Sequence, residues 1–198
     1  MNQLATVIGA VPFYLVGTFP TGLLVARLHG IDITSHGSGN VGATNIARVI
    51  GKRAGVLTLI GDALKGFLGV CVAQLVSHDV EFAAAAAAAV VCGHCFSIPP
   101  YFKGGKGVAT ALGALLALQP WCALLGIAVF ACSFAFSRIV SLSSILAALA
   151  APIGAFLLNE PEPVSLAVVI VSGVVIIRHR ENIQRLIEGR EARFEAKK

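Results

Sequence analysis

The chain has 198 residues, of which 57% are hydrophobic and 13% are charged, and its formal net charge is +5. A soluble domain usually carries about 25% charged residues, so this composition excludes an ordinary soluble protein and predicts a polytopic membrane protein. The apolar runs are continuous and do not alternate with polar residues, which favours an all-α bundle over a β-barrel.

Seven apolar segments are predicted to be transmembrane helices: 4–28, 54–77, 80–96, 108–119, 121–137, 142–158 and 163–178. The first basic residue is Arg27, after the first apolar stretch. This argues against a secretory signal and predicts a retained helix, which Pro12 and Pro20 can kink. The fourth segment is short, because twelve helical residues rise only about 18 Å. Either it begins deeper in the membrane, or it forms a re-entrant hairpin with the fifth, which leaves five full spans.

Lysine and arginine residues fall almost entirely in alternate breaks between these segments. The basic breaks hold Arg48, Lys52, Arg53, then Lys103 and Lys106, then Arg138, then the residues from Arg178 to Lys198; the other breaks hold Asp79, Glu81, Glu160 and Glu162. By the positive-inside rule, the basic breaks are cytoplasmic, the N-terminus is outside and the C-terminus is inside. We expect one integral membrane domain over residues 1–198, with residues 179–198 as a charged cytoplasmic tail.

Two features inside the apolar segments have more than one interpretation. The five cysteines all lie in such segments, and Cys92-Gly-His-Cys95 has no second cysteine pair, so we expect buried, unreactive thiols and no metal site. Asp62 and Lys65 lie three residues apart on one helical face. They are either an ion pair near the membrane interface or a bundle-facing pair that supports an active site.

The most unusual stretch is Tyr101–Thr110, which reads YFKGGKGVAT and directly precedes the fourth apolar segment. Glycines let backbone N–H groups form an anion nest, a helix N-terminus adds positive potential, and two lysines add charge. It is not a nucleotide P-loop, since Pro100 and Gly107 stand where that motif needs glycine and a hydroxyl residue. We predict a phosphate-binding loop; a lysine pair placed only by the positive-inside rule is the alternative.

Two further polar clusters lie on the same predicted face. Residues 37–48 supply neutral donors and an Arg48 guanidinium suited to phosphate, although this stretch could be an ordinary turn before an interfacial helix. In residues 178–191, His179 and Asn182 can face one way on a helix, with Arg185 nearly in line. The other basic residues of the tail are predicted to bind anionic lipid: Arg178, Arg180, Arg190, Arg193, Lys197 and Lys198.

A weaker feature on this face is the segment 138–144, which places hydroxyl residues at the start of the sixth apolar segment. Ser141 or Ser143 could cap that helix, and Ser144 could reach the site.

Together the clusters resemble the bacterial acyl-phosphate:glycerol-3-phosphate acyltransferase family of the PlsY type. The resemblance rests on Ser38-Gly-Asn-x-Gly-x-x-Asn-x-x-Arg48, on Gly93-His94 followed by Phe102-Lys-Gly-Gly-Lys-Gly-Val-Ala-Thr110, and on His179-x-x-Asn-Ile-x-Arg-Leu-x-x-Gly-x-Glu191. It implies a seven-helix enzyme of the bacterial inner membrane with its active site facing the cytoplasm. The implied reaction moves an acyl chain from acyl phosphate to the 1-hydroxyl of glycerol 3-phosphate, which gives lysophosphatidic acid and phosphate and begins phospholipid synthesis.

The chemistry of this reaction assigns roles to the clusters. Acyl phosphate is already activated, so we expect direct attack by the glycerol hydroxyl without an acyl-enzyme, and the resemblance favours a phosphate oxygen as the proton acceptor. The expected catalytic residues are Ser38, Arg48, Lys106, His179 and Asn182. The expected substrate-binding residues are Asn40, Gly42, Asn45, His94, Lys103, Gly104, Gly105, Gly107, Ser141, Ser144 and Arg185. His94 and His179 are the only candidates for a protein base at neutral pH.

We expect no cofactor, no metal and no nucleic acid. The expected partners are acyl phosphate, glycerol 3-phosphate, membrane lipids and the enzyme that makes the acyl phosphate. Two other classes were weighed. A transporter or channel for phosphorylated metabolites would need cations along several spans, and a lipid-phosphate hydrolase would need a nucleophile set that the sequence does not display.

Overall fold

The computed structural model describes residues 3–96 and 104–195, so Lys103 lies outside the described residues. The described chain is all-helical, as predicted. The helices are α1 (Gln3–Gly17), α2 (Thr21–Leu28), the 3-10 turn η1 (Ile33–Ser35), α3 (Ala43–Val49), α4 (Lys52–Val76), α5 (Val80–Cys95), α6 (Val108–Leu118), α7 (Pro120–Ser137), α8 (Val140–Leu157), α9 (Glu162–Arg178) and α10 (Arg180–Ile187).

Each predicted apolar segment coincides with one of these helices, or with the pair α1 and α2, to within a few residues. Among the described residues, four helical stretches are long and apolar enough to cross a membrane: Gln3–Leu28, α4, α7 and α8. A fifth is added if α9 and α10, bent by 59°, count as one span, whereas α5 and α6 are shorter apolar helices. Large apolar side chains such as Leu75, Phe136 and Phe156 are at least 80% exposed, as expected where lipid replaces water.

The first apolar segment is broken rather than only kinked. Pro12 lies inside α1 without ending it, and Pro20 directly precedes α2. At the break, the Lys65 ammonium of α4 donates a hydrogen bond to the Phe19 carbonyl at 2.9 Å. The same oxygen accepts from the Thr21 N–H at 3.1 Å, so the buried lysine is its second donor at the break.

Asp62 and Lys65 form an ion pair at 2.9 Å, and the two residues are 3% and 9% exposed. The two residues therefore form an ion pair that faces the helix bundle, and its support of an active site stays a prediction.

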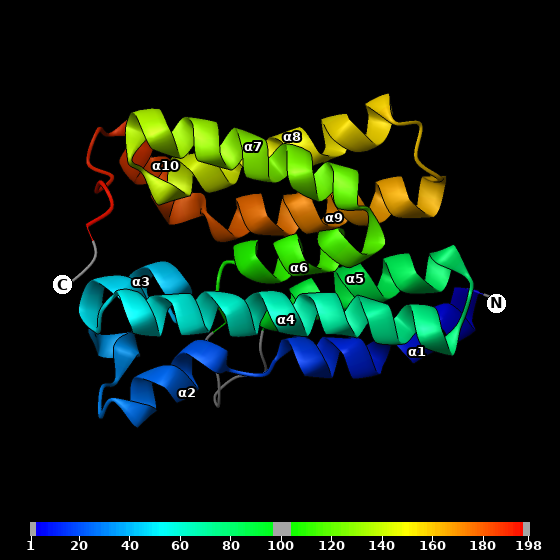
Figure 1. Ribbon diagram of the computed structural model, residues 1–198, viewed down its shortest axis with the longest axis horizontal. Coiled ribbons are helices and arrows are strands. Elements are labelled where there is room, and N and C mark those ends of the chain that lie inside the picture. The colour runs from blue at the N-terminus through cyan, green and yellow to red at the C-terminus, as the bar shows by residue number, and fades with distance from the viewer. Residues whose placement is uncertain (1–2, 97–103, 196–198) are drawn as a thin grey trace.

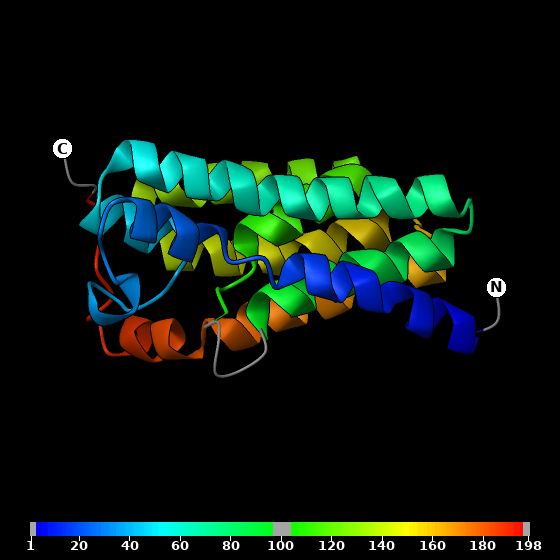
Figure 2. The ribbon, with the colours of Figure 1, turned by 90° about the horizontal axis from the view of Figure 1, so that it is seen from below.

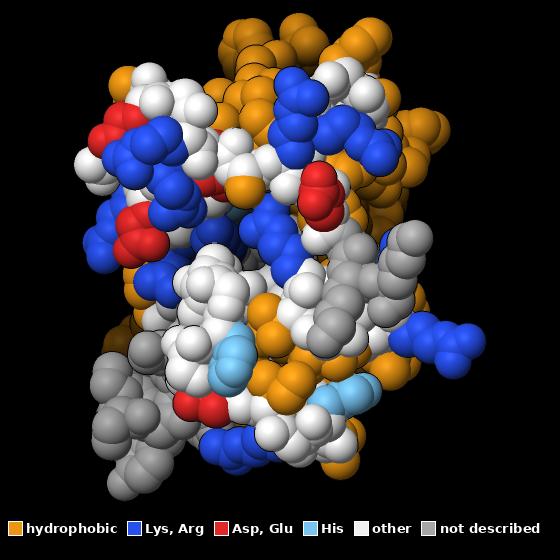
Figure 3. All heavy atoms as spheres, turned by 90° about the vertical axis from the view of Figure 1, so that its left-hand side faces the viewer, with side chains coloured by type: hydrophobic (Ala, Val, Ile, Leu, Met, Phe, Trp, Pro, Cys, Tyr) orange, Lys and Arg blue, Asp and Glu red, His pale blue; other side chains and the backbone are white. Residues whose placement is uncertain are grey.

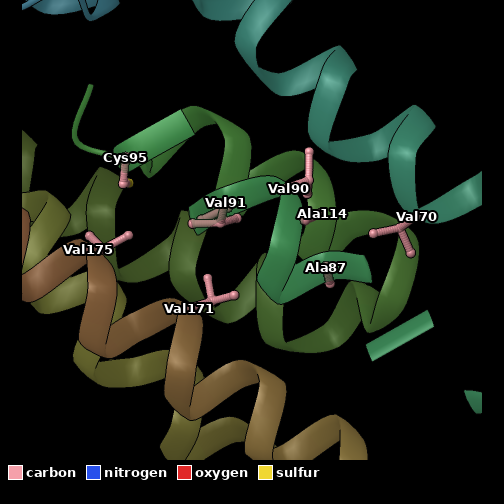
Figure 4. Packing of buried hydrophobic residues seen from close by; sticks show 9 residues of the cluster. Val70, Ala87, Val90, Val91, Cys95, Ala114, Val171 and Val175 are labelled. Atoms are coloured by element: carbon pink, nitrogen blue, oxygen red, sulfur yellow. The ribbon is translucent and has the colours of Figure 1, made fainter. Parts of the chain in front are cut away.

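Helix α5 lies at the centre of the main apolar core. Its Val90 and Val91 are fully buried among residues of three neighbouring helices, including Val70 of α4, Ala114 of α6 and Val171 of α9 (Figure 4). Glycines bring the helices into close contact. A Cβ on Gly66 of α4 would lie 2.2 Å from the Thr110 carbonyl oxygen, and one on Gly113 of α6 would lie 1.9 Å from the Ala63 carbonyl oxygen. Small residues at both positions are what let α4 and α6 pack backbone to backbone.

The long helices run roughly along one axis, and the two ends of the chain lie at opposite ends of it (Figures 1 and 2). The end that carries α3, the α7–α8 turn and α10 holds Arg48, Arg138 and the basic residues of the range 180–193, and we call it the basic end. Helix α6 begins well inside the bundle as seen from this end (Figure 1). This agrees with the first alternative for the short fourth segment, a helix that starts deeper than its neighbours.

Candidate active site

A chain of hydrogen bonds joins the glycine-rich loop that holds Lys106 to the 178–191 cluster inside the basic end. The Lys106 ammonium donates to Asn182 Oδ1 at 2.5 Å, and Asn182 Nδ2 donates to Glu191 Oε1. The Asn182 amide thus presents its oxygen to a cation and its nitrogen to an anion. The flipped amide would place NH₂ against ammonium, so the charges on both sides fix its orientation.

Glu191 is the centre of this network, and its side chain is 8% exposed. Its Oε1 also accepts from the Ser141 hydroxyl of α8 at 2.6 Å, and its Oε2 accepts from Arg185 Nε of α10 at 2.6 Å. A single carboxylate therefore ties α8, α10 and, through Asn182, the Lys106 loop together. Burial alone would raise the pKa of Glu191, but the hydrogen bonds from Ser141, Arg185 and Asn182 outweigh it and leave the pKa below its usual value.

The positive charge around this network exceeds the negative charge. Burial lowers the pKa of the Lys106 ammonium from 10.5 to about 8; the charges of Glu191 and Glu181 oppose that shift, and those of Arg185 and Arg48 reinforce it. Viewed from the basic end, Lys and Arg side chains gather around a hollow in the surface (Figure 3). A site with excess, partly desolvated positive charge stabilises a phosphate dianion, which would restore the ammonium pKa.

The loop Gly104–Gly107 is held in place by Arg178, which was expected to bind lipid. Arg178 donates through Nε to the Gly105 carbonyl at 3.0 Å and through a terminal nitrogen to the Gly104 carbonyl at 2.9 Å. Its guanidinium also lies 5.7 Å from the centre of the Phe96 ring. The lipid-binding role predicted for Arg178 is therefore corrected, since its donors hold the loop beside Lys106.

The glycines of this loop are needed for close packing against the end of α5. A Cβ on Gly104 would lie 2.2 Å from the Cys95 carbonyl oxygen, and one on Gly105 would lie 2.2 Å from His94 Nε2. Gly107 has φ +82°, a conformation that favours glycine, and it directly precedes α6. The Gly105 N–H donates to the His94 carbonyl at 3.0 Å, so the predicted nest of free amides is wrong at that position.

His179 lies at the bend between α9 and α10 and is 2% exposed. Its Nδ1 lies 2.7 Å from the Val175 carbonyl oxygen, which can only accept a hydrogen bond. Nδ1 therefore carries the proton, and Nε2 of the neutral ring is left with its lone pair. His179 and Asn182 are both buried at the basic end, as the three-residue spacing led us to expect.

The 37–48 cluster forms an ordered turn around Asn45. Asn45 Nδ2 donates to the carbonyls of His36 and Asn40, and its Oδ1 accepts from the Ser38 N–H at 2.9 Å. Because the 2%-exposed amide uses both of its ends on the backbone, its predicted contact with substrate is corrected to ordering of this turn. Asn40 Oδ1 likewise accepts from the Gly42 N–H at 2.8 Å, which occupies the Gly42 donor.

The turn leaves two functional groups of the 37–48 cluster available, the Ser38 hydroxyl and the Arg48 guanidinium. Ser38 is exposed, and its hydroxyl has no hydrogen-bond partner in the part of the chain that the structure describes. Arg48 of α3 is half-buried, has no carboxylate within 4.0 Å among residues 3–96 and 104–195, and lies near enough for its charge to lower the pKa of Lys106. Arg48 can therefore donate to an anion without first breaking an ion pair.

His94 lies in a different polar group from Lys106. Its Nδ1 is 3.7 Å from Asp62 Oδ1, and it lines a small open cavity together with Asp62, Lys65, Gly105 and the α1–α2 break. This cavity shares only His94 and Gly105 with the predicted site residues. The predicted role of His94 as a substrate ligand stays a prediction; in the structure its ring packs against the loop and leaves no room for a side chain at Gly105.

The hydroxyl residues of α8 also differ from expectation. Neither Ser141 nor Ser143 caps the helix, because Ser141 donates to Glu191 and Ser143 donates to the Ile139 carbonyl at 3.0 Å. Ser144 is 2% exposed and donates to the Val140 carbonyl of its own helix at 2.8 Å.

Glu191 and Arg178 were not predicted as site residues, because both stand among many tail charges in the sequence. The usable signal for Glu191 was its place at the end of the third motif. Arg178 carries no such signal, since its partners are backbone carbonyls 73 and 74 residues away. Among the described residues, no group of three or more His, Cys, Asp or Glu side chains could hold a metal ion.

Comparison with known proteins gives one consistent family. The family model for glycerol-3-phosphate acyltransferase matches residues 7–189. The glycerol-3-phosphate acyltransferase of Trichlorobacter lovleyi is 48% identical over 183 residues, which cover 92% of this chain and 94% of that protein. The enzyme of the same name from Geobacter sulfurreducens is 45% identical with the same coverage.

Two solved structures are similar over nearly the whole chain. The crystal structure of PlsY, an integral membrane glycerol 3-phosphate acyltransferase, in its glycerol 3-phosphate form has a TM-score of 0.90 at 40% identity and 96% coverage of both chains. Its lysophosphatidic acid form has a TM-score of 0.87 at 41% identity, with 98% of this chain and 96% of that chain covered.

Proposed function

The chain belongs to the glycerol-3-phosphate acyltransferase family, and from this premise we propose how its residues carry out the transfer. It is an integral membrane glycerol-3-phosphate acyltransferase whose product is lysophosphatidic acid. The donor that we propose is acyl phosphate, because a second phosphate substrate accounts for the excess of cations around Lys106.

In the proposed reaction, the 1-hydroxyl oxygen of glycerol 3-phosphate attacks the acyl carbonyl carbon. A new ester C–O bond forms, and the bond between the carbonyl carbon and the phosphate oxygen breaks. The hydroxyl proton moves to an oxygen of the departing phosphate, so inorganic phosphate is released and no acyl-enzyme forms. Catalysis then consists of holding two anionic substrates together and stabilising the charge that develops on the phosphate.

Lys106 and Arg48, with the exposed Ser38 hydroxyl, are the groups that we assign to phosphate. Lys106 lies directly before the N-terminus of α6, whose partial positive charge adds to that of the ammonium. Arg48 has five N–H donors in a fork that fits two phosphate oxygens. The observation that carries this assignment is the Lys106–Asn182–Glu191 network, since it holds a partly desolvated cation in place without pairing it directly to a carboxylate.

His179 and Asn182 are the groups that we assign to glycerol 3-phosphate. With Nδ1–H bonded to Val175, the His179 ring offers Nε2 as an acceptor for a substrate hydroxyl. We propose that it orients the attacking hydroxyl and that the phosphate takes the proton. His179→Ala should then raise the KM for glycerol 3-phosphate more than it lowers kcat, whereas a collapse of kcat alone would identify His179 as the base.

We also propose seven membrane crossings, with the N-terminus outside and the basic end in the cytoplasm of the bacterial inner membrane. The positive-inside distribution of Lys and Arg supports this orientation. A water-soluble substrate could then enter from the cytoplasm, while the acyl donor enters from the lipid or from the enzyme that makes it. The orientation is tested by placing a single cysteine in the 138–139 turn or in the 159–161 turn and labelling intact cells with an impermeant thiol reagent. Labelling of the 138–139 cysteine would contradict the proposed orientation.

The central experiment supplies purified protein in detergent with acyl phosphate, with and without glycerol 3-phosphate, and follows both phosphate release and lysophosphatidic acid. We expect equal amounts of the two products, and neither without the acceptor. Phosphate release that does not depend on the acceptor would favour a hydrolase. Absence of both products, with uptake of glycerol 3-phosphate into proteoliposomes, would favour a transporter.

A further inference from the structure

Residues 190–195, which we call the C-terminal strap, leave α10 and run across the basic end toward α3 (Figure 1). The match to the family model ends at residue 189, so the strap lies beyond the matched part of the chain. One end of the strap is fixed by Glu191, which accepts hydrogen bonds from Ser141, Asn182 and Arg185. The other end is fixed by Phe194, whose N–H donates to the Arg138 carbonyl at 2.7 Å.

The Phe194 ring lies between two helices that carry different parts of the site. On one side its centre is 6.1 Å from that of Phe134 of α7, with the rings at 62°. On the other side its centre is 6.0 Å from Cζ of Arg48 on α3, within the range of a cation–π contact. Phe194 therefore links the guanidinium of α3 to the α7–α8 turn.

We propose that Phe194 is a positioning residue for Arg48 and that the C-terminal strap is part of the active site. An arginine side chain loses conformational freedom when it binds an anion, and a contact that fixes it beforehand lowers that cost. A carboxylate could fix Arg48 too, but it would compete with phosphate for the same N–H donors. An aromatic face holds the guanidinium while leaving its donors at the ring edge open.

The support for Phe194 itself is backbone and aromatic packing rather than charge. Its N–H partner, Arg138, has φ +59°, so the carbonyl that receives the bond belongs to a tight left-handed turn between α7 and α8. The Arg138 guanidinium lies 5.6 Å from the centre of the Phe134 ring, which packs against Phe194 in turn. The strap is thus seated on the α7–α8 turn at the point where it reaches Arg48.

The inference rests on the proposed phosphate-binding role of Arg48, and the test compares four proteins: wild type, Phe194→Leu, Phe194→Tyr and Arg48→Lys. Leucine keeps apolar volume but removes the π face, and tyrosine keeps both. For each protein, kcat and the KM of both substrates are measured, together with the thermal midpoint in detergent. The matched control is Phe136→Leu, because Phe136 is a phenylalanine of α7 that is 87% exposed.

We expect Phe194→Leu to raise about 5-fold the KM of the same substrate whose KM rises in Arg48→Lys, with kcat changed less than about 2-fold. Phe194→Tyr should restore the wild-type KM, Phe136→Leu should match wild type, and the thermal midpoints should agree. Wild-type KM values for both substrates in Phe194→Leu would overturn the inference. A raised KM in Phe194→Leu that Phe194→Tyr shares would also overturn it, because that result would indicate a packing defect and not the loss of the aromatic face.

The failure of this inference is separable from the failure of the phosphate assignment. If Arg48→Lys has wild-type constants, the proposed role of Arg48 is wrong. If Arg48→Lys is impaired and Phe194→Leu is not, only the role of Phe194 is wrong.

Discussion

Lys106 Nζ lies 2.5 Å from Asn182 Oδ1, although the two residues are 76 positions apart in the chain. The contact joins the glycine-rich loop before α6 to the helix α10 that follows the last long helix. Among residues 3–96 and 104–195 the ammonium has no direct carboxylate partner, because the Asn182 amide stands between it and Glu191. Lys106 is therefore held in one position while most of its charge stays available to a substrate anion.

The depressed pKa of Lys106 predicts a pH dependence. Burial lowers this pKa to about 8, so the ammonium is protonated below that pH and loses its charge as the pH rises through it. We expect kcat/KM, which reports the free enzyme, to fall above about pH 8. Lys106→Arg keeps its charge and should lose that alkaline limb while retaining part of the activity. Initial rates at limiting substrate check this, with enzyme-free blanks for donor hydrolysis. An unchanged limb in Lys106→Arg would show that another group titrates.

Glu191→Gln should lower activity and shift the alkaline limb of the pH profile of kcat/KM. Glu191 raises the pKa of Lys106, so removal of its charge lets that pKa fall and shifts the limb to lower pH. Loss of the charged bond from Arg185 should also lower kcat/KM by about 10-fold. The matched control is Glu188→Gln, since Glu188 pairs with Arg190 on the surface. Equal pH profiles for the two variants would contradict the position of Glu191 in the site.

Arg178→Lys should lower kcat/KM by about 10-fold, because a single ammonium does not reproduce the fork that binds two loop carbonyls. Arg180 is exposed and lies two residues further on, so Arg180→Lys is the control and should match wild type. Both are assayed in detergent and in bilayers with and without anionic lipid. If the activities of the two variants are equal and both depend on anionic lipid, that result would contradict the loop-holding role of Arg178 and support lipid binding.

Asp62→Asn should destabilise the protein by about 3 kcal/mol, because it leaves the buried Lys65 ammonium without its counter-charge. Asp62→Asn combined with Lys65→Met removes both charges and should recover part of that loss. Denaturant unfolding in detergent, followed by the fluorescence of the single tryptophan Trp121, measures both. A double variant less stable than Asp62→Asn would show that the Lys65 bond to Phe19 matters more than the charge balance.

The helices could be predicted from the sequence because lipid imposes one requirement on every span, a continuous apolar helix. The kink predicted at Pro20 coincides with the interruption between α1 and α2. The Lys65 hydrogen bond to the Phe19 carbonyl at this point could not be predicted, because its donor comes from another helix. The fourth segment was recognised as short, but its depth is set by how α6 packs on α4 through Gly66 and Gly113.

The site could be predicted at the level of motifs and only partly at the level of roles. Lys106 and Asn182 were expected together and lie together. Asn45 and the loop glycines are residue types that often bind anions. In this structure, however, the Asn45 amide is hydrogen-bonded to the backbone, and neighbouring atoms fill the space beside the glycines. The contact of Arg178 with two backbone carbonyls involves no side-chain pattern in its partners, so only the structure identifies it.

The most direct test of the account is the turnover of Lys106→Ala in purified, detergent-solubilised protein, measured as lysophosphatidic acid formed from acyl phosphate and glycerol 3-phosphate. Wild type and Lys52→Ala, which removes an exposed lysine at the start of α4, serve as references. We predict that Lys106→Ala keeps its membrane insertion and thermal midpoint but loses at least about 100-fold in kcat/KM. Activity within a few-fold of wild type in a folded Lys106→Ala protein would contradict the claim that this ammonium holds the reacting phosphate.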